Sequence, residues 1–109
     1  MILSHKSDCI DSLINVLEKT SVWRKGVSEK FEDPRNAKAS ATLEKLANEA
    51  VNLTDDQFSQ LRPHFNWSPA WRDGLFQAAR FVGFAHKSTG LDSFVRLLVR
   101  QFPQNEIAA

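Results

Sequence analysis

Residues 8–32 read DCIDSLINVLEKTSVWRKGVSEKFE, and the apolar spacing within them predicts an α-helical fold. Seven residues recur at steps of three or four: Cys9, Leu13, Val16, Thr20, Trp23, Val27 and Phe31. Such spacing places side chains on one face of a helix. The stretch therefore predicts one long helix from about Asp8 to Glu32, capped by Ser7 or Asp8. We call its apolar face the seam.

Two features of this stretch argue against a continuous helix. Thr20-Ser21 could cap a second helix, and Gly26 in a helix interior costs about 1 kcal/mol relative to Ala. One helix, bent or straight, is the favoured interpretation. The seam either packs in the core of the molecule or forms a dimerising coiled coil, for which three heptads with Thr20 among them are short and imperfect.

Helix start and stop signals divide the next part of the chain. Asp33-Pro34 ends the first helix and begins a second, which ends near Asn52. Thr54-Asp-Asp-Gln57 is a capping box, with Leu53 placed to pack against Phe58. Pro63 ends this short helix, and a loop follows.

Two further helices are expected after this loop. Ser68-Pro69 begins a helix that reaches about Ser88, with Gly90 as its left-handed stop. The last helix begins at Asp92 or Ser93 and is closed by Pro103. The fold class is therefore predicted to be all-α: a compact irregular bundle of five helices, or six if the first breaks, with no β-sheet.

Length and composition bound the class of protein. The chain has 109 residues, 42% apolar and 25% charged, as expected for one globular domain over residues 1–109, with a frayed tail from about 104 to 109. Cys9 is the only cysteine, so no internal disulfide can form, and we expect a cytoplasmic location. No stretch approaches the ~20 apolar residues of a membrane span, so no membrane partner is expected.

Aromatic and arginine residues are concentrated in the second half of the chain. Residues 58–109 hold seven of eight Phe and five of seven Arg, and their net charge is +3 against −2 for residues 1–57. In the helix expected over residues 69–88, one apolar stripe consists of Trp71, Leu75, Ala78, Val82 and Ala85. A second line, Phe76, Arg80 and Phe84, lies on the opposite side, which should be polar on an exposed helix.

This second line has two interpretations, which the sequence does not separate. The helix is central in a single-chain bundle, or Phe76, Arg80 and Phe84 form the interface of a homodimer. The last helix, apolar on most sides, would join that interface with Arg96 and Arg100. Arg and large aromatic residues are enriched in interface cores.

Two other kinds of binding site are weighed against this interface. One is a pocket for a flat or anionic ligand, lined by aromatic and basic residues near the loop: His64, Phe65, Trp67, Trp71 and Arg72. The other is a nucleic-acid surface using Arg72, Arg80, Arg96 and Arg100. A pI near 7.9 lacks the strong basic footprint of most such proteins, so nucleic acid is possible but not favoured.

Catalytic and metal signatures are missing from the sequence. The three His and single Cys are scattered, and no nucleophile elbow or phosphate-binding glycine loop is present. We therefore expect no enzyme activity, cofactor or metal. The function predicted from the sequence is that of a small cytoplasmic interaction or regulatory protein, with a homodimer or another protein as its partner.

Overall fold

The computed structural model describes residues 6–64, 69–82 and 90–101, and these residues form helices and no β-strand. The elements are α1 (Lys6–Phe31), α2 (Pro34–Ala50), α3 (Asp55–Leu61), the 3₁₀ turn η1 (Arg62–His64), α4 (Pro69–Arg80) and α5 (Leu91–Gln101). The predicted all-α class with five helices is confirmed for this part of the chain.

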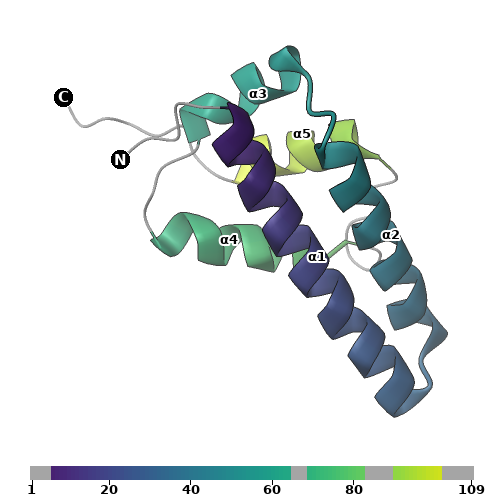
Figure 1. Cartoon of the computed structure of the whole chain (residues 1–109). Helices are drawn as coiled ribbons and strands as arrows, with labels where there is room; N and C mark the ends of the chain where they lie inside the picture. Colours follow the sequence, from purple (N-terminus) through teal and green to yellow (C-terminus); the bar gives the residue numbers. More distant parts are fainter. Residues whose placement is uncertain (1–5, 65–68, 83–89, 102–109) are drawn as a thin grey trace.

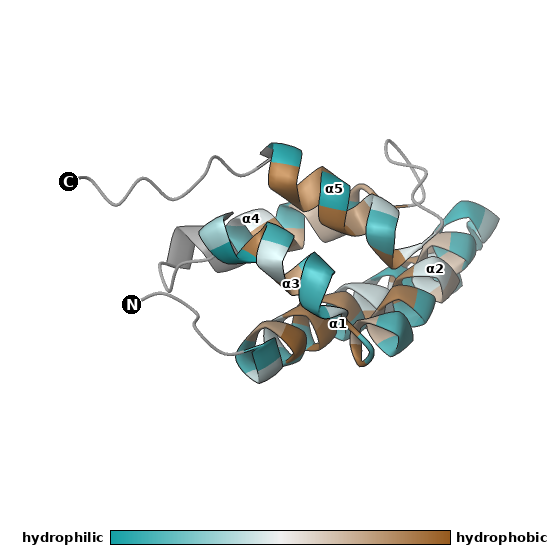
Figure 2. Ribbon diagram, turned by 90° about the horizontal axis from the view of Figure 1, so that it is seen from above, coloured by the Kyte–Doolittle hydropathy of each residue, from teal (hydrophilic) through white to brown (hydrophobic). Residues whose placement is uncertain are grey.

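The long helices α1 and α2 form an antiparallel hairpin, and the shorter helices pack on one side of it (Figures 1 and 2). Helix α4 contacts α1, whereas α5 contacts α2, α3 and α4. Helices α4 and α5 run across the hairpin rather than along it, and they cover only its part nearest Lys6 and Ala50 (Figure 1). We call this part the proximal half and the part nearest the α1–α2 turn the distal half.

Helix α1 runs without a break through Gly26, as favoured from its spacing, and ends in a left-handed turn at Glu32. The φ of Glu32 is 51°, and the next amide, Asp33 N–H, donates to Ser28 O at 3.2 Å. This is the bond of a Schellman motif, which usually has glycine at the left-handed position. Asp33 then caps α2, because its Oδ1 accepts from Arg35 N–H at 2.9 Å.

Partly buried polar contacts stabilise the start of α3 and of α5. The predicted capping box is present: Gln57 N–H donates to Thr54 Oγ1 at 3.1 Å, and Thr54 N–H donates to Gln57 Oε1 at 3.0 Å. The side-chain amide nitrogen of Gln57, Nε2, also donates to Asp92 Oδ1 on α5. Leu91 N–H donates to a carboxylate oxygen of Glu49 on α2 at 2.8 Å, so an orphan donor of α5 has a partner.

The helix expected to reach Ser88 ends at Arg80, which corrects the prediction. Phe81 N–H donates to Ala78 O and Val82 N–H to Ala79 O, both at 3.2 Å, so the last turn tightens. The Arg80 carbonyl accepts a hydrogen bond from the Arg24 guanidinium of α1. A tertiary contact thus lies at the end of α4, and residues 83–88 of the expected helix lie outside the described residues.

Gly90 does not have the left-handed conformation predicted for it. It directly precedes α5, and its carbonyl accepts the first helical bond, from Phe94 N–H at 3.2 Å. The left-handed turn lies at Glu32, which the sequence does not mark because glutamate rarely adopts positive φ.

The hydrophobic core lies in the proximal half, between the hairpin and the other helices. Its largest fully buried side chain, among the described residues, is Phe94 of α5, which lies in one cluster with leucines of α1, α2 and α4. In the distal half the hairpin is held by small polar residues. Ser21 Oγ and Ser40 Oγ each contact the other residue's carbonyl oxygen at 2.9 Å. The distal half of the hairpin therefore contributes little to the hydrophobic core.

We expect Glu32→Gly to stabilise the protein by about 0.5–1 kcal/mol. A non-glycine residue in the left-handed region destabilises the folded chain by roughly 1–2 kcal/mol. Glycine removes this strain, but its greater entropy in the unfolded chain offsets part of the gain. Urea denaturation followed by circular dichroism measures the change. Glu32→Ala removes the same charge and keeps the strain, so its stability should match that of the original chain; equal stabilisation by Ala would assign the effect to the charge.

Candidate functional site

The seam of α1 is buried in its first half and exposed in its second. Cys9, Leu13, Val16 and Thr20 are at most 3% exposed. Val27 is half-buried, whereas Trp23 is 45% and Phe31 65% exposed. The interpretation of the seam as core is therefore right for its proximal part and wrong for its distal part.

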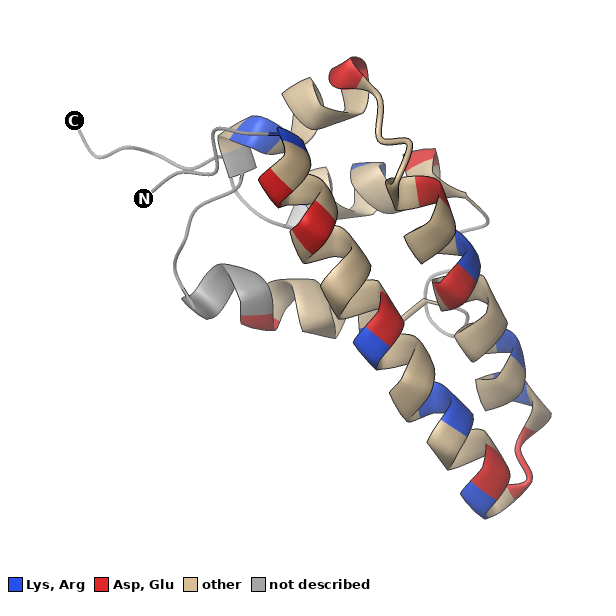
Figure 3. Ribbon diagram, viewed as in Figure 1, with Lys and Arg blue, Asp and Glu red and all other residues tan. Residues whose placement is uncertain are grey.

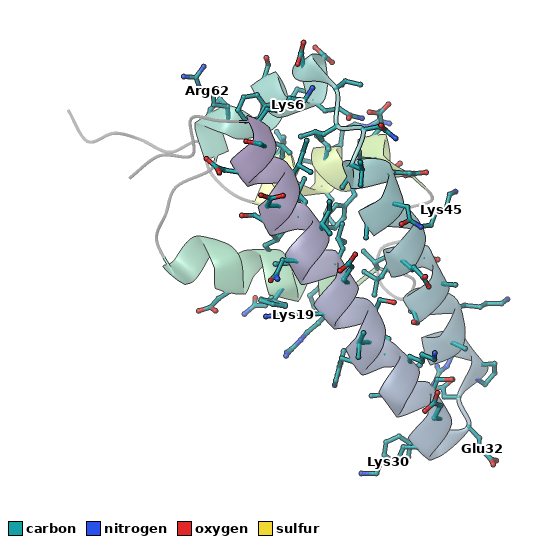
Figure 4. All side chains as sticks on the ribbon, viewed as in Figure 1. Lys6, Lys19, Lys30, Glu32, Lys45 and Arg62 are labelled. Carbon is teal, nitrogen blue, oxygen red and sulfur yellow. The ribbon has the colours of Figure 1, made fainter. Side chains whose placement is uncertain are left out.

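Helix α4 ends beside this exposed part of the seam. Phe81, the residue after α4, is 52% exposed, and Arg80 lies over Trp23. We define the distal surface by its residues: Lys19, Trp23, Gly26, Val27, Lys30 and Phe31 of α1, with Arg80 and Phe81. Figure 4 shows Lys19 where α1 meets α4 and Lys30 at the tip of the hairpin, both on the side of α1 away from α2.

Arg24 joins three helices beneath this surface. One terminal nitrogen of its guanidinium donates to Asn36 Oδ1 of α2 at 2.9 Å, and the other donates to the Arg80 carbonyl of α4. Asn36 is buried and in turn donates to Asp33 Oδ2 at 2.8 Å. A cation at a helix C-terminus is favourable because the last carbonyls carry partial negative charge. Arg24 thus acts as the cap of α4.

Two guanidinium groups lie over the indole ring of Trp23. The guanidinium carbon is 4.4 Å from the ring centroid for Arg24 and 5.3 Å for Arg80. Both distances are within the range of cation–π attraction. Burial and then the positive charge of Arg80 lower the pKa of Arg24, and Asp33 opposes this shift. The ring and the two cations make a positively charged aromatic surface that suits carboxylates and apolar groups.

We predict that Arg24→Met destabilises the fold by about 1–3 kcal/mol, because the bonds to Asn36 and to the Arg80 carbonyl are lost. Urea denaturation measures the cost, and faster amide exchange at the end of α4 would locate it. Lys25→Met removes a charge from the exposed neighbouring position and should change stability by no more than about 0.5 kcal/mol. Equal effects of the two variants would show that Arg24 does not cap α4.

The structure describes four of the five residues predicted for the subunit interface. Phe76 is half-buried and packs against the core cluster, Arg80 is exposed, and Phe84 lies outside the described residues. Because α4 ends at Arg80, the three do not form a continuous helical line. Arg96 and Arg100 are exposed on α5. The homodimer and nucleic-acid interpretations built on these residues stay predictions.

The predicted ligand pocket falls largely outside the described part of the chain. Phe65 and Trp67 are not described, and for His64, Trp71 and Arg72 only the backbone is, in η1 and α4. The pocket stays a prediction. Among the described residues, no group of three or more His, Cys, Asp or Glu side chains could hold a metal ion. None of the described helices is both long enough and apolar enough to cross a membrane.

Cys9 is a buried thiol in the core, and burial raises its pKa to about 12 from 9.0. The unfolded chain therefore loses this proton first, so stability should fall as the pH rises above 9, by about 1.4 kcal/mol at pH 10. Urea denaturation at several pH values measures the loss. A matched loss in Cys9→Val would assign it to other groups. The native thiol should also react with a disulfide reagent only on unfolding.

The distal surface was missed from the sequence because Trp23 and Arg80 are far apart in the chain. Their contact depends on where α4 ends. The available signal in the sequence was the set of basic residues and Gly26 that accompany the seam after Trp23.

Comparison with known proteins finds no relative of this chain. No family model matches the chain, no curated protein is significantly similar to its sequence, and no solved structure is significantly similar to its fold. Function therefore has to be inferred from the surface that the helices present.

Proposed function

We propose that this protein acts by binding another protein through its distal surface. The observation that carries the proposal is the exposed continuation of the α1 seam. The apolar face that is buried in the core beside Leu13 and Val16 continues into solvent as Trp23 and Phe31. Phe81 adds a third exposed aromatic ring at the end of α4.

Because these rings are exposed to water, the fold does not gain the free energy that their burial would contribute. Full burial of one large apolar side chain contributes about 1.5–3 kcal/mol. Scattered exposed apolar residues need no explanation, but four of the five large exposed apolar residues in the described chain lie in the distal half of α1 or at the end of α4. They are Val22, Trp23, Phe31 and Phe81.

The composition of the surface favours a protein partner. Trp and Arg are the residues most enriched among binding hot spots, and here they are already in contact. The stacked arrangement reduces the rotamer freedom that binding would otherwise have to remove. This proposal keeps Arg80 from the sequence-based interface and replaces Phe76 and Phe84 with Trp23, Phe31 and Phe81. Binding of this kind involves no bond chemistry, and the cytoplasmic location stays a prediction.

Exposed rings that serve binding should be dispensable for folding. We expect Phe31→Ser and Phe81→Ser to change the free energy of unfolding by no more than about 0.5 kcal/mol. Phe94→Ala, in the core, should cost about 3–5 kcal/mol. Urea denaturation of the three variants makes the comparison. A loss above about 2 kcal/mol at Phe31 would place that ring in the core and remove the basis of the proposal.

A photo-crosslinking experiment tests the binding itself. Benzoylphenylalanine is placed at position 31 or at Val51, a similarly exposed apolar residue at the proximal end, in cells that naturally express the chain. We expect a discrete adduct from position 31 that disappears in Trp23→Ser, and none from position 51. Identical adducts from both positions, or an adduct that persists in Trp23→Ser, would contradict the proposal.

A further inference from the structure

The distal surface is basic, which restricts what can cover it. From Lys19 to Phe31, α1 carries four basic residues and one acidic residue (Figure 3). Arg80 adds a further positive charge from α4. The ion pairs of the described residues are Lys6–Asp55, Arg35–Asp33 and Lys45–Glu49, none of which involves Lys19, Lys30 or Arg80. A partner with carboxylates at its edges would therefore find these three cations available.

The same charges disfavour a second copy at this surface. In a closed dimer with two-fold symmetry the same patch of each copy meets itself. Lys19, Lys30 and Arg80 of one copy would then approach those of the other, and like charges across an interface are destabilising. Charge complementarity thus favours an acidic partner over self-association.

Gly26 indicates a close approach of backbone to backbone. A Cβ added at Gly26 would meet nothing within 4 Å, so the packing of the chain on itself does not require glycine here. Glycine in a helix interior nevertheless costs about 1 kcal/mol relative to alanine. Gly26 lies between Trp23 and Lys30 on the same side of α1, three and four residues from each. The missing side chain would let another helix lie directly against α1.

The spacing of the aromatic anchors fits one face of a helix. Trp23 and Phe31 are eight residues apart, about 12 Å along the axis of α1. A helix that packs against them offers anchors at i, i+4 and i+7 over the same length. Flanking Glu or Asp side chains would reach Lys19, Lys30 and the guanidinium of Arg80, which can bind a carboxylate through two parallel hydrogen bonds.

We propose that the distal surface binds an acidic amphipathic helix of a partner protein, which packs against the backbone at Gly26. This inference rests on the proposed function and specifies the partner class. The contact is small, so we expect a dissociation constant in the micromolar range, typical of a transient interaction.

The test uses two designed helical peptides of about 15 residues, the length at which isolated helices begin to be stable. Both carry leucines at i, i+4 and i+7; in one the flanking positions are glutamate and in the other lysine. Fluorescence anisotropy should give binding of the glutamate peptide at least about tenfold tighter than that of the lysine peptide. A double change, Lys19→Glu with Lys30→Glu, should reverse the order. Lys38→Glu, the same change on exposed α2, should leave it unaltered.

Gly26→Ala separates binding from folding. The added methyl group should raise the melting temperature by about 4 °C through helix propensity. It should also lower the affinity for the glutamate peptide about tenfold, because the methyl group holds the two helices apart. If the variant is more stable and binds less well, its loss of affinity cannot be due to unfolding. Unchanged affinity in Gly26→Ala would overturn the close approach.

The remaining outcomes separate this inference from the proposed function. If both peptides bind equally well and Phe31→Ser abolishes their binding, the inference that the partner is acidic would be wrong, whereas the proposed function of protein binding would stand. A concentration-dependent dimer in light scattering, abolished by Phe31→Ser, would make a second copy the occupant and overturn the inference. Tighter binding of a single-stranded oligonucleotide than of either peptide, lost in Trp23→Ser, would overturn both proposals.

Discussion

The structure depends on how little of the α1–α2 hairpin the other helices cover. Helix α1 has 26 residues, about 39 Å at 1.5 Å per residue, and an apolar seam along its whole length. Helices α4 and α5 run across the hairpin rather than along it (Figure 1). Two helices in this arrangement close a core over only part of the hairpin. The proximal half therefore becomes the hydrophobic core, and the distal half keeps apolar side chains in contact with water.

Arg24 stands at the boundary between the two halves. Its side chain donates to the last carbonyl of α4 and to the amide oxygen of Asn36 on α2, at the place where α4 ends. It also holds a cation against Trp23. The same side chain thus contacts both the end of α4 and the indole that Arg80 overlies. Because Arg24 takes part in the fold and in the candidate surface, a stability measurement and a binding measurement are both needed to separate its roles.

The distal half is held together without the core. Ser21 and Ser40 exchange hydrogen bonds with each other's backbone, and the small side chains let α1 and α2 approach closely. Such polar contacts keep the two helices in register while leaving the outer face of α1 unoccupied. A rigid helix with exposed aromatic rings is a prearranged binding surface, because little conformational freedom remains to be lost.

Much of the fold could be predicted from the sequence, because its signals are local. Helical spacing, the Asp33-Pro34 start and the Thr54–Gln57 capping box act within a few residues, and all three are present in the structure. The end of α4 and the left-handed turn at Glu32 could not be predicted, since no local signal marks them: the first lies at a tertiary bond from Arg24, and the second has glutamate at positive φ. For the candidate surface, the sequence by itself determined the seam and its cations. Only the tertiary structure decided which half of the seam is buried, because that depends on where the other helices cross the hairpin.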